Sequence, residues 1–239
     1  MIDALCHLEL CDDPARAAAQ AARVGVVALI CAGVDPRSDR ALPPLPAPPT
    51  LLRAWGIHPQ AVDDDALTEQ LVALERRLDE PAVVAIGECG LDRRAGLPPP
   101  AAQERALAAQ LALAAARGLP VILHLVRAHA RGLALVEASG VRRGAWHAFA
   151  GPKEAIGPAL ALGLWLSVGG LVLNGNARRL REAVTHIPPE RLLVETDAPD
   201  LAPARLPDVV AELARLRGEH AGALAERTAA NARALFQLP

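Results

Sequence analysis

The stretch Ile86-Gly87-Glu88-Cys89-Gly90-Leu91-Asp92 holds a carboxylate between two glycines, directly after the apolar run 83–86. Short runs rich in β-branched and other apolar residues are typical of buried strands. Taken alone, Glu88 is best explained as a charged residue that marks the point where a strand gives way to a loop. Other apolar runs in the chain also end in histidine or aspartate, however, and this recurrence predicts a shared site.

Length and composition indicate a globular protein. The 239 residues are enough for one large domain with a sizeable core, and the 52% hydrophobic content excludes disorder as the general state. A membrane span and a secretory signal are not expected, because no uncharged apolar run is long enough and no basic segment follows Met1. The four cysteines lack CxxC spacing, so we expect reduced thiols and a cytoplasmic location.

Net charge and aromatic content restrict the ways in which the protein can bind a polyanion. The net charge is −2, and only 2% of the residues are aromatic, with no tyrosine. A chain-wide basic field for non-specific nucleic-acid binding is therefore excluded, and so is an extended base-stacking platform. A polyanionic substrate would need a localised site.

Strands and helices are expected to alternate along the whole chain. The strand candidates cover residues 2–7, 26–32, 51–57, 83–88, 120–124, 144–149, 163–168 and 191–197. The helix candidates cover residues 14–24, 65–78, 101–117, 128–138, 153–162, 177–185, 207–217 and 221–236. The proline-rich segment 42–49 is expected to be a loop, and a short helix over 35–41 is an alternative to further loop.

Eight βα units without a dividing linker predict one domain over residues 1–239. The fold class is α/β, a single (β/α)8 TIM barrel with its active site at the C-terminal ends of the strands. The rival is an open doubly wound sheet. That fold would more naturally carry a glycine-rich phosphate loop after its first strand, and the sequence has none there.

Polar residues recur where the expected strands end. The six are His7, His58, Glu88, His124, His147 and Asp197. In a parallel barrel these strand ends lie on one face, so the side chains are expected to converge in the barrel mouth. A single histidine at such a place is more often a hydrogen-bonded core residue, but six coincidences at one edge predict a site for one or two divalent metals. His129, His186 and His220 are expected to be ordinary helix or loop residues.

Basic residues near the expected mouth are candidates for binding a phosphate. Arg127 follows His124 closely and is predicted to bind substrate, although a solvated loop arginine explains it equally well. The same two alternatives hold for Arg93, Arg94 and Lys153.

These motifs together resemble the TatD family of metal-dependent deoxyribonucleases, which are amidohydrolase-like TIM barrels. The resemblance rests on segments that occur in order over essentially the whole chain: 3–7, 56–59, 87–92, 119–124, 147–151, 195–199 and 231–236. It implies that Glu88 bridges two metals, that His124 and His147 complete one site, and that His7 and Asp197 belong to the other. The family's His-x-His pattern reads Leu5-Cys6-His7 here, so leucine stands in the place of one ligand.

The implied activity is metal-dependent hydrolysis of DNA phosphodiester bonds, on a single strand or an end, in an exonuclease-like manner. Mg²⁺, Mn²⁺ or Zn²⁺ would supply an acidified water, and Asp197 would accept its proton. Glu88 would act mainly as a bridging ligand, and His58 would contact the scissile phosphate. Glu195 either orients a ligand or is simply a buried barrel residue. Because the remaining three ligands suffice for Mg²⁺, Mn²⁺ or catalytic Zn²⁺, Leu5 is expected to weaken the first site rather than abolish it.

Three alternatives to this activity stay open. The same scaffold could hydrolyse an amide, ester or lactone, because the fold does not determine the substrate. Leu5 also suggests a catalytically impaired pseudoenzyme that binds a nucleic acid or protein partner. The third alternative is an interaction module with a buried polar core, and no specific protein partner is predicted.

Overall fold

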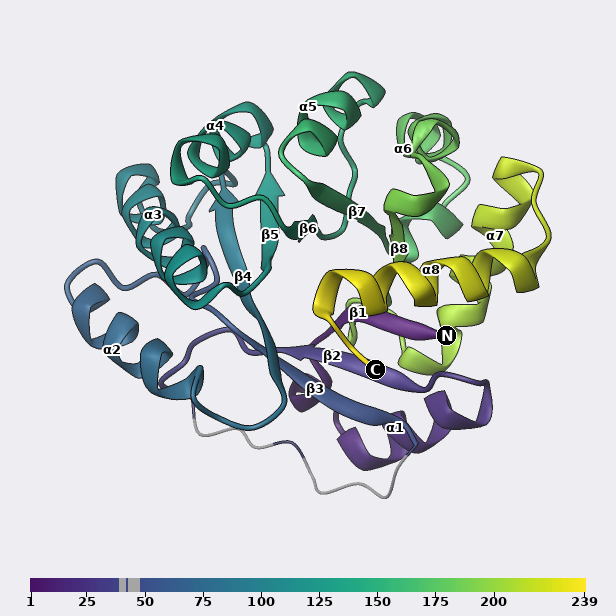
Figure 1. Ribbon diagram of the computed structural model, residues 1–239, viewed down its shortest axis with the longest axis horizontal. Helices are drawn as coiled ribbons and strands as arrows, with labels where there is room; N and C mark the ends of the chain where they lie inside the picture. Colours follow the sequence, from purple (N-terminus) through teal and green to yellow (C-terminus); the bar gives the residue numbers. More distant parts are fainter. Residues whose placement is uncertain (39–41, 43–47) are drawn as a thin grey trace.

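Eight parallel strands form a nearly closed barrel in a computed structural model that describes residues 1–38, 42 and 48–239. The sheet order follows the chain order, and helices surround the strands (Figure 1). The strands are β1 (Ile2–Cys6), β2 (Ala28–Ala32), β3 (Thr50–Trp55), β4 (Val83–Asp92), β5 (Val121–Val126), β6 (Gly144–Trp146), β7 (Leu164–Val168) and β8 (Leu192–Val194). The TIM-barrel prediction is confirmed, and the open doubly wound alternative is wrong.

Local chemistry explains two of the helix ends. The helices are α1 (Pro14–Arg23), α2 (Leu67–Arg77), α3 (Pro100–Arg117), α4 (His129–Ser139), α5 (Ile156–Ala161), α6 (Arg178–Ala183), α7 (Leu206–Arg217) and α8 (Ala221–Phe236). Asp13 caps α1 by accepting a hydrogen bond from the Arg16 amide at 2.9 Å. Gly118 ends α3 in the left-handed conformation, with φ of 65°.

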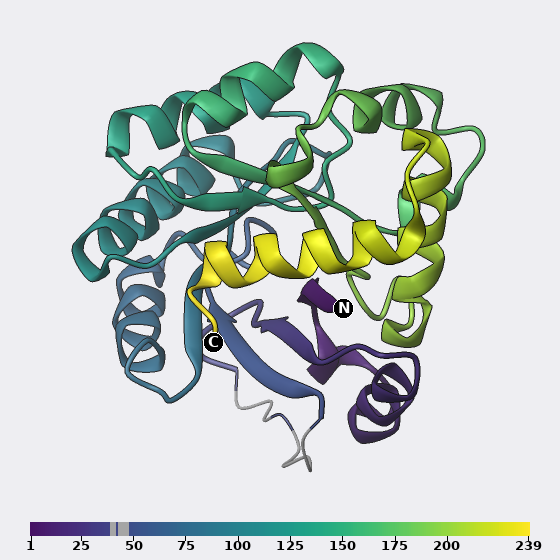
Figure 2. The ribbon, with the colours of Figure 1, turned by 45° about the vertical axis from the view of Figure 1, so that its right-hand side comes forward.

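Helix α8 crosses one end of the barrel, next to the N-terminus (Figures 1 and 2). Its buried Leu235 and Phe236 pack with Ile2, Ala28 and Ala54, which lie in the first strands. Small inward side chains fill the barrel interior above it, and a larger apolar layer lies between strands and helices. The N-terminal end of the barrel is therefore closed by packing, which leaves chemistry to the opposite end.

Hydrogen bonds between the segments of β1 and β8 bring the ends of the sheet together. The Asp197 amide donates to the Leu5 carbonyl at 3.0 Å, and the His7 amide donates to the Ala198 carbonyl at 2.8 Å. The buried Asp3 carboxylate accepts the Thr196 amide at 2.9 Å and the Thr196 hydroxyl at 2.5 Å. These bonds hold His7 beside Asp197, although the two residues lie at opposite ends of the sequence.

Most strand boundaries shift by one or two residues from the sequence-based expectation, and three C-terminal ends shift further. Strand β4 continues past Glu88 to Asp92, β6 ends before His147, and β8 ends at Val194. Strand β4 continues because Gly90 lets its backbone approach β5: a Cβ at Gly90 would lie 1.9 Å from the His124 carbonyl oxygen. Glu88 and His124 therefore lie inside strands rather than at their final residues.

The expected loop 42–49 and the alternative short helix over 35–41 fall largely outside the described residues. Of the helix candidate, residues 35–38 are described and form a turn, in which the Asp35 carboxylate accepts the Arg37 amide at 2.9 Å. Over the described ranges, no helix combines the length and the apolar character that crossing a membrane requires.

Candidate active site

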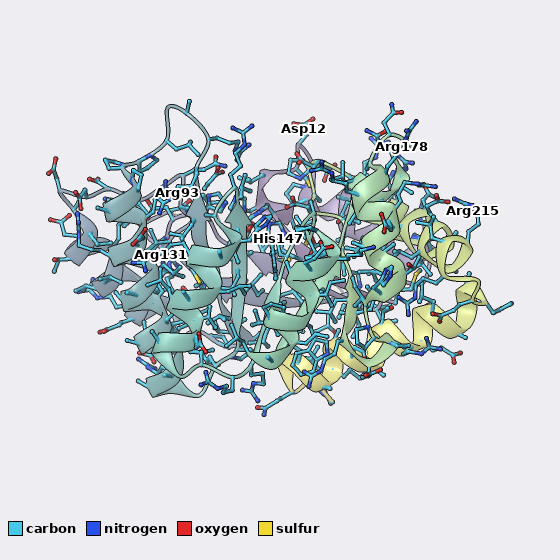
Figure 3. All side chains as sticks on the ribbon, turned by 90° about the horizontal axis from the view of Figure 1, so that it is seen from above. Asp12, Arg93, Arg131, His147, Arg178 and Arg215 are labelled. Atoms are coloured by element: carbon cyan, nitrogen blue, oxygen red, sulfur yellow. The ribbon has the colours of Figure 1, made fainter. Side chains whose placement is uncertain are left out.

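All six predicted site residues line one cavity of about 530 Å³. They come from six different strands or from the segments that directly follow them, as the parallel barrel requires. Figure 3 shows His147 near the centre of the barrel, while Arg131 and Arg215 lie on the surrounding helices. In the same view α8 lies at the lower end, away from Asp12 and Arg178. The site therefore opens at the end that α8 leaves uncovered.

Glu88 lies at the centre of the cluster. One carboxylate oxygen is 2.6 Å from His7 Nε2, and the other is 2.8 Å from His147 Nε2 and 3.2 Å from His124 Nδ1. Its side chain is only 1% exposed. A carboxylate this deeply buried needs positive charge around it.

The surrounding histidines respond to that charge. Burial raises the pKa of Glu88, but the charges of His147 and His7 outweigh it and hold the pKa well below the usual range. Burial lowers the pKa of His7, yet Glu88 and Asp197 overcome it and raise the pKa to about 9. The pKa of His147 is raised for the same reason, by Glu88 and Glu195 against burial. Protons on these imidazoles supply the positive charge that a divalent cation would bring.

Three histidines share a hydrogen-bonding pattern that leaves one ring nitrogen facing the centre. His7 Nδ1 donates to the Ala32 carbonyl at 2.7 Å, and His147 Nδ1 donates to Glu195 at 3.2 Å. His124 Nε2 donates to Asp92 at 3.3 Å. Since a carbonyl or carboxylate oxygen only accepts, each of these nitrogens carries a proton. The other ring nitrogen of each residue therefore faces Glu88 and can offer its lone pair to a cation bound beside that carboxylate.

His58 has the opposite arrangement. Its Nδ1 accepts the Gln60 amide at 3.2 Å, so in the neutral ring the proton resides on Nε2. Burial lowers the pKa of His58 to about 4, with Glu88 opposing that effect only in part. Nε2 lies 3.4 Å from His124 Nδ1 and points into the same cluster. A neutral imidazole with N–H at this place is suited to donate to a phosphate oxygen.

Asp197 is the carboxylate of the cluster that solvent reaches. Its side chain is 27% exposed, and one oxygen lies 3.6 Å from His7 Nε2. Burial raises the pKa of Asp197 to about 6. The charge of His147 lowers this pKa, and the charge of Glu88 raises it. A partly exposed carboxylate that borders the cavity can accept a proton from water.

The donor set fits one or two divalent cations. Two groups have ligand atoms that all lie within 4.8 Å of one another: His7, Glu88 and Asp197, and His58, Glu88 and His124. Carboxylate oxygens and imidazole nitrogens suit Zn²⁺ and Mn²⁺, and the carboxylates also suit Mg²⁺. Distance alone places His58 in the second group. The hydrogen bond to His58 Nδ1 leaves a proton on the Nε2 that faces the cluster, however, whereas His147 can present a lone pair there, so we favour His147 as the ligand.

Leu5 lies on the inner side of β1 beneath His7. Its side chain is fully buried and packs with Ile2, Ala4 and Ile30 in the barrel interior. Because a hydrocarbon side chain has no lone pair, the group His7, Glu88 and Asp197 receives no donor from position 5.

The sequence analysis assigned no role to Asp92, which contacts His124 in the structure, whereas its candidate Arg94 lines the cavity. Asp92 is buried and accepts from His124, and Arg94 lines the cavity and binds the Asp92 carboxylate through Nε at 3.0 Å. Burial raises the pKa of Asp92, but the hydrogen bonds from Arg94 and His124 outweigh burial and lower that pKa strongly. Alternation would have found Asp92, because Glu88, Gly90 and Asp92 lie on one side of an extended β4.

The other basic candidates lie elsewhere. Arg127 is exposed and is not among the residues that line the cavity, so its binding role stays a prediction. Arg93 pairs with Glu104 at 2.6 Å, and Lys153 pairs with Glu182 at 2.7 Å. Arg94 is thus the arginine of this group that faces the cavity.

Replacing Glu195 by glutamine is expected to weaken metal binding by about tenfold to a hundredfold. Glu195 is fully buried, and its Oε1 accepts both His147 Nδ1 and the Ala148 amide, the latter at 2.6 Å. Glutamine keeps an acceptor there but loses the charge that makes His147 a stronger ligand. Isothermal titration calorimetry with Mn²⁺ measures the effect, and an unchanged dissociation constant would mean that Glu195 only fills space.

Comparisons with known proteins agree with this geometry. A family model described as "TatD related DNase" matches residues 2–237. The 3'-5' ssDNA/RNA exonuclease TatD of Edwardsiella piscicida is 38% identical over 95% of this chain and 94% of its own length. The crystal structure of YJJV, a TatD homolog from Escherichia coli, superposes with a TM-score of 0.86 at 30% identity, covering 100% of this chain and 98% of that one. The phosphotriesterase homology protein of Escherichia coli, solved with phosphate in its active site, shares the fold with a TM-score of 0.73 at 14% identity, over 99% of this chain and 98% of its own.

Proposed function

The chain belongs to the TatD-related DNase family, and from this premise we propose its function. We propose that the protein is a metal-dependent 3'-5' exonuclease of single-stranded nucleic acid. One observation carries the proposal. Three imidazoles with fixed outer N–H groups converge on the buried Glu88 and leave a fourth, His58, as a neutral donor. This arrangement suits a metal-assisted hydrolase, and the exonuclease activity of the named relatives supports a nucleic-acid substrate and the 3'-5' polarity. No comparison favours an amide, ester or lactone hydrolase or a pseudoenzyme.

Metal binding and proton transfer are assigned to different groups of the cavity. His7, Glu88, His124, His147 and Asp197 would hold the cations, with Glu88 between the two sites. A bound divalent metal supplies an acidified water for the attack and positive charge against the phosphate. Asp197 accepts the proton of the attacking water, because it is the partly exposed carboxylate beside His7.

The substrate phosphate would be positioned by neutral and cationic donors. His58 Nε2–H donates to a phosphate oxygen, and Arg94, which is 49% exposed, offers a guanidinium at the cavity wall. Arg127, which follows the lining residue Val126, is kept as a further candidate for substrate binding. We place the whole activity in one domain over residues 1–239 and in the cytoplasm, where the four free thiols would stay reduced.

Digestion of 5'-labelled single-stranded DNA and RNA tests the proposal. With Mg²⁺, Mn²⁺ or Zn²⁺ added, we expect a ladder of products that shortens stepwise from the 3' end, and chelation should stop it. A strand whose last 3' linkages are phosphorothioates serves as the control for polarity. Intact strands under all three metals would overturn the proposal.

A further inference from the structure

A second cavity of about 570 Å³ lies directly beside the metal cavity. The two cavities share Ala148, Asp197 and Asp200 as common lining. The second cavity is formed by the segments that follow β6, β7 and β8, so it lies on the same open end of the barrel. A ligand whose phosphate occupies the metal cavity can therefore extend into it.

The lining of this cavity is mainly apolar. Phe149, Leu173 and Leu201 contribute to it, and Leu171 stands at its opening with half of its surface exposed. Gly170 allows its backbone to pack closely against Leu201, since a Cβ at position 170 would lie 3.3 Å from the Leu201 side chain. Apolar surface that Leu171 and the partly exposed Leu173 present beside a reaction site marks a place for an apolar part of the ligand.

The charges around the cavity restrict what that part can be. Glu195, Asp197 and Asp200 form the wall toward the metal site, and their carboxylates oppose a second phosphate there. Arg205 lies at another side of the cavity, but its Nε is paired with Asp208 at 2.8 Å. The occupant is therefore an uncharged group joined to a phosphate by a short linker. The volume lies within the range of about 300–1,000 Å³ that small-molecule sites span.

We propose that this cavity is a nucleobase subsite, which receives the base of a nucleotide adjoining the scissile phosphate. The proposal rests on the nuclease function proposed above and deepens it. Because apolar side chains make up much of the lining, the subsite accepts any of the bases and adds affinity without strong sequence preference.

Nucleotide binding tests the subsite without requiring turnover. Calorimetry in the presence of Mn²⁺ compares thymidine 5'-monophosphate with 2-deoxyribose 5-phosphate, which lacks the base. We expect the nucleotide to bind the unmodified chain more tightly, and Leu171→Ser to remove most of that difference, a change of about threefold to tenfold. Leu171 is half exposed, so the substitution should not disturb folding. Val72→Ser on α2 removes an equally exposed apolar side chain away from both cavities and serves as the matched control.

Strand cleavage provides the second measurement. Oligonucleotides with an abasic residue at the terminal or the penultimate 3' position are compared with the intact strand. At least one abasic strand should be cut more slowly by the unmodified chain and should be insensitive to Leu171→Ser. Base-dependent nucleotide binding without cleavage would support the subsite and overturn the nuclease function. Cleavage with equal rates on all strands, and equal binding of both phosphates, would overturn the subsite and leave the nuclease function intact.

Discussion

Glu88→Gln is expected to lower kcat/KM on single-stranded DNA by at least about a thousandfold. The carboxylate lies within 3.2 Å of ring nitrogens from His7, His124 and His147, so both candidate metal sites depend on its charge. Glutamine has nearly the same shape but carries no charge, and its amide group presents N–H donors to nitrogens that must offer lone pairs. Loss of the charge should therefore remove the cations as well as the activity.

Two measurements separate this effect from misfolding. The number of Mn²⁺ ions bound, found by calorimetry, should fall in Glu88→Gln, while the far-ultraviolet circular dichroism spectrum stays that of the unmodified chain. Glu226→Gln is the matched control, because Glu226 is an exposed carboxylate on α8 at the far end of the barrel. A Glu88→Gln protein that keeps nuclease activity within tenfold of the unmodified chain would contradict the central role of Glu88.

The barrel and the convergence of its six polar residues were predictable because both follow from periodicity. A βα alternation without a linker leaves few folds, and parallel strands bring their C-terminal ends to one face whatever the details of packing. The ends of individual strands were less predictable, because a neighbour decides them. Strand β4 reaches Asp92 because Gly90 permits a close approach to β5 and β5 offers partners as far as Val126, a pairing that the sequence of β4 alone does not reveal.

The roles of the individual histidines could not be read from the sequence. His7 is oriented by a backbone carbonyl of β2, at Ala32, and any residue at position 32 would present the same oxygen. His58 differs from His7 in that the backbone amide of Gln60 donates to its Nδ1. Such backbone partners leave no compositional signal. The second cavity is similar, because its wall contains a 3-10 turn, Gly170–Leu173, that has no periodic pattern.

Leu5→His is expected to strengthen the weaker metal site by at least about tenfold. Leu5 lies on the inner side of β1, and its carbonyl accepts the Asp197 amide at 3.0 Å, so position 5 is held next to one ligand of the site. An imidazole there would add a fourth protein donor to His7, Glu88 and Asp197. Calorimetry should show one tight and one weak site in the unmodified chain, and two sites of similar affinity in Leu5→His.

The same substitution should change activity in a way that depends on metal concentration. At limiting Mn²⁺ the Leu5→His protein should cut single-stranded DNA faster, and at saturating Mn²⁺ the two proteins should converge, since occupancy rather than chemistry separates them. Burying an imidazole without its metal costs about 1–3 kcal/mol. Thermal unfolding should therefore occur at a lower temperature in metal-free Leu5→His than in the unmodified chain, and Mn²⁺ should reverse the difference.

Leu5→Met separates coordination from a change in packing. Methionine conserves the volume of leucine in a core, and its thioether is a poor ligand for a hard cation such as Mn²⁺. This control should bind metal as the unmodified chain does and should not gain activity at limiting Mn²⁺. If Leu5→His leaves the weaker dissociation constant unchanged while the protein stays folded, position 5 does not reach the metal, and the three donors His7, Glu88 and Asp197 form the full protein contribution to that site. If activity appears only in Leu5→His at every metal concentration, the chain has kept the barrel and the second site but lost its catalysis through this one residue.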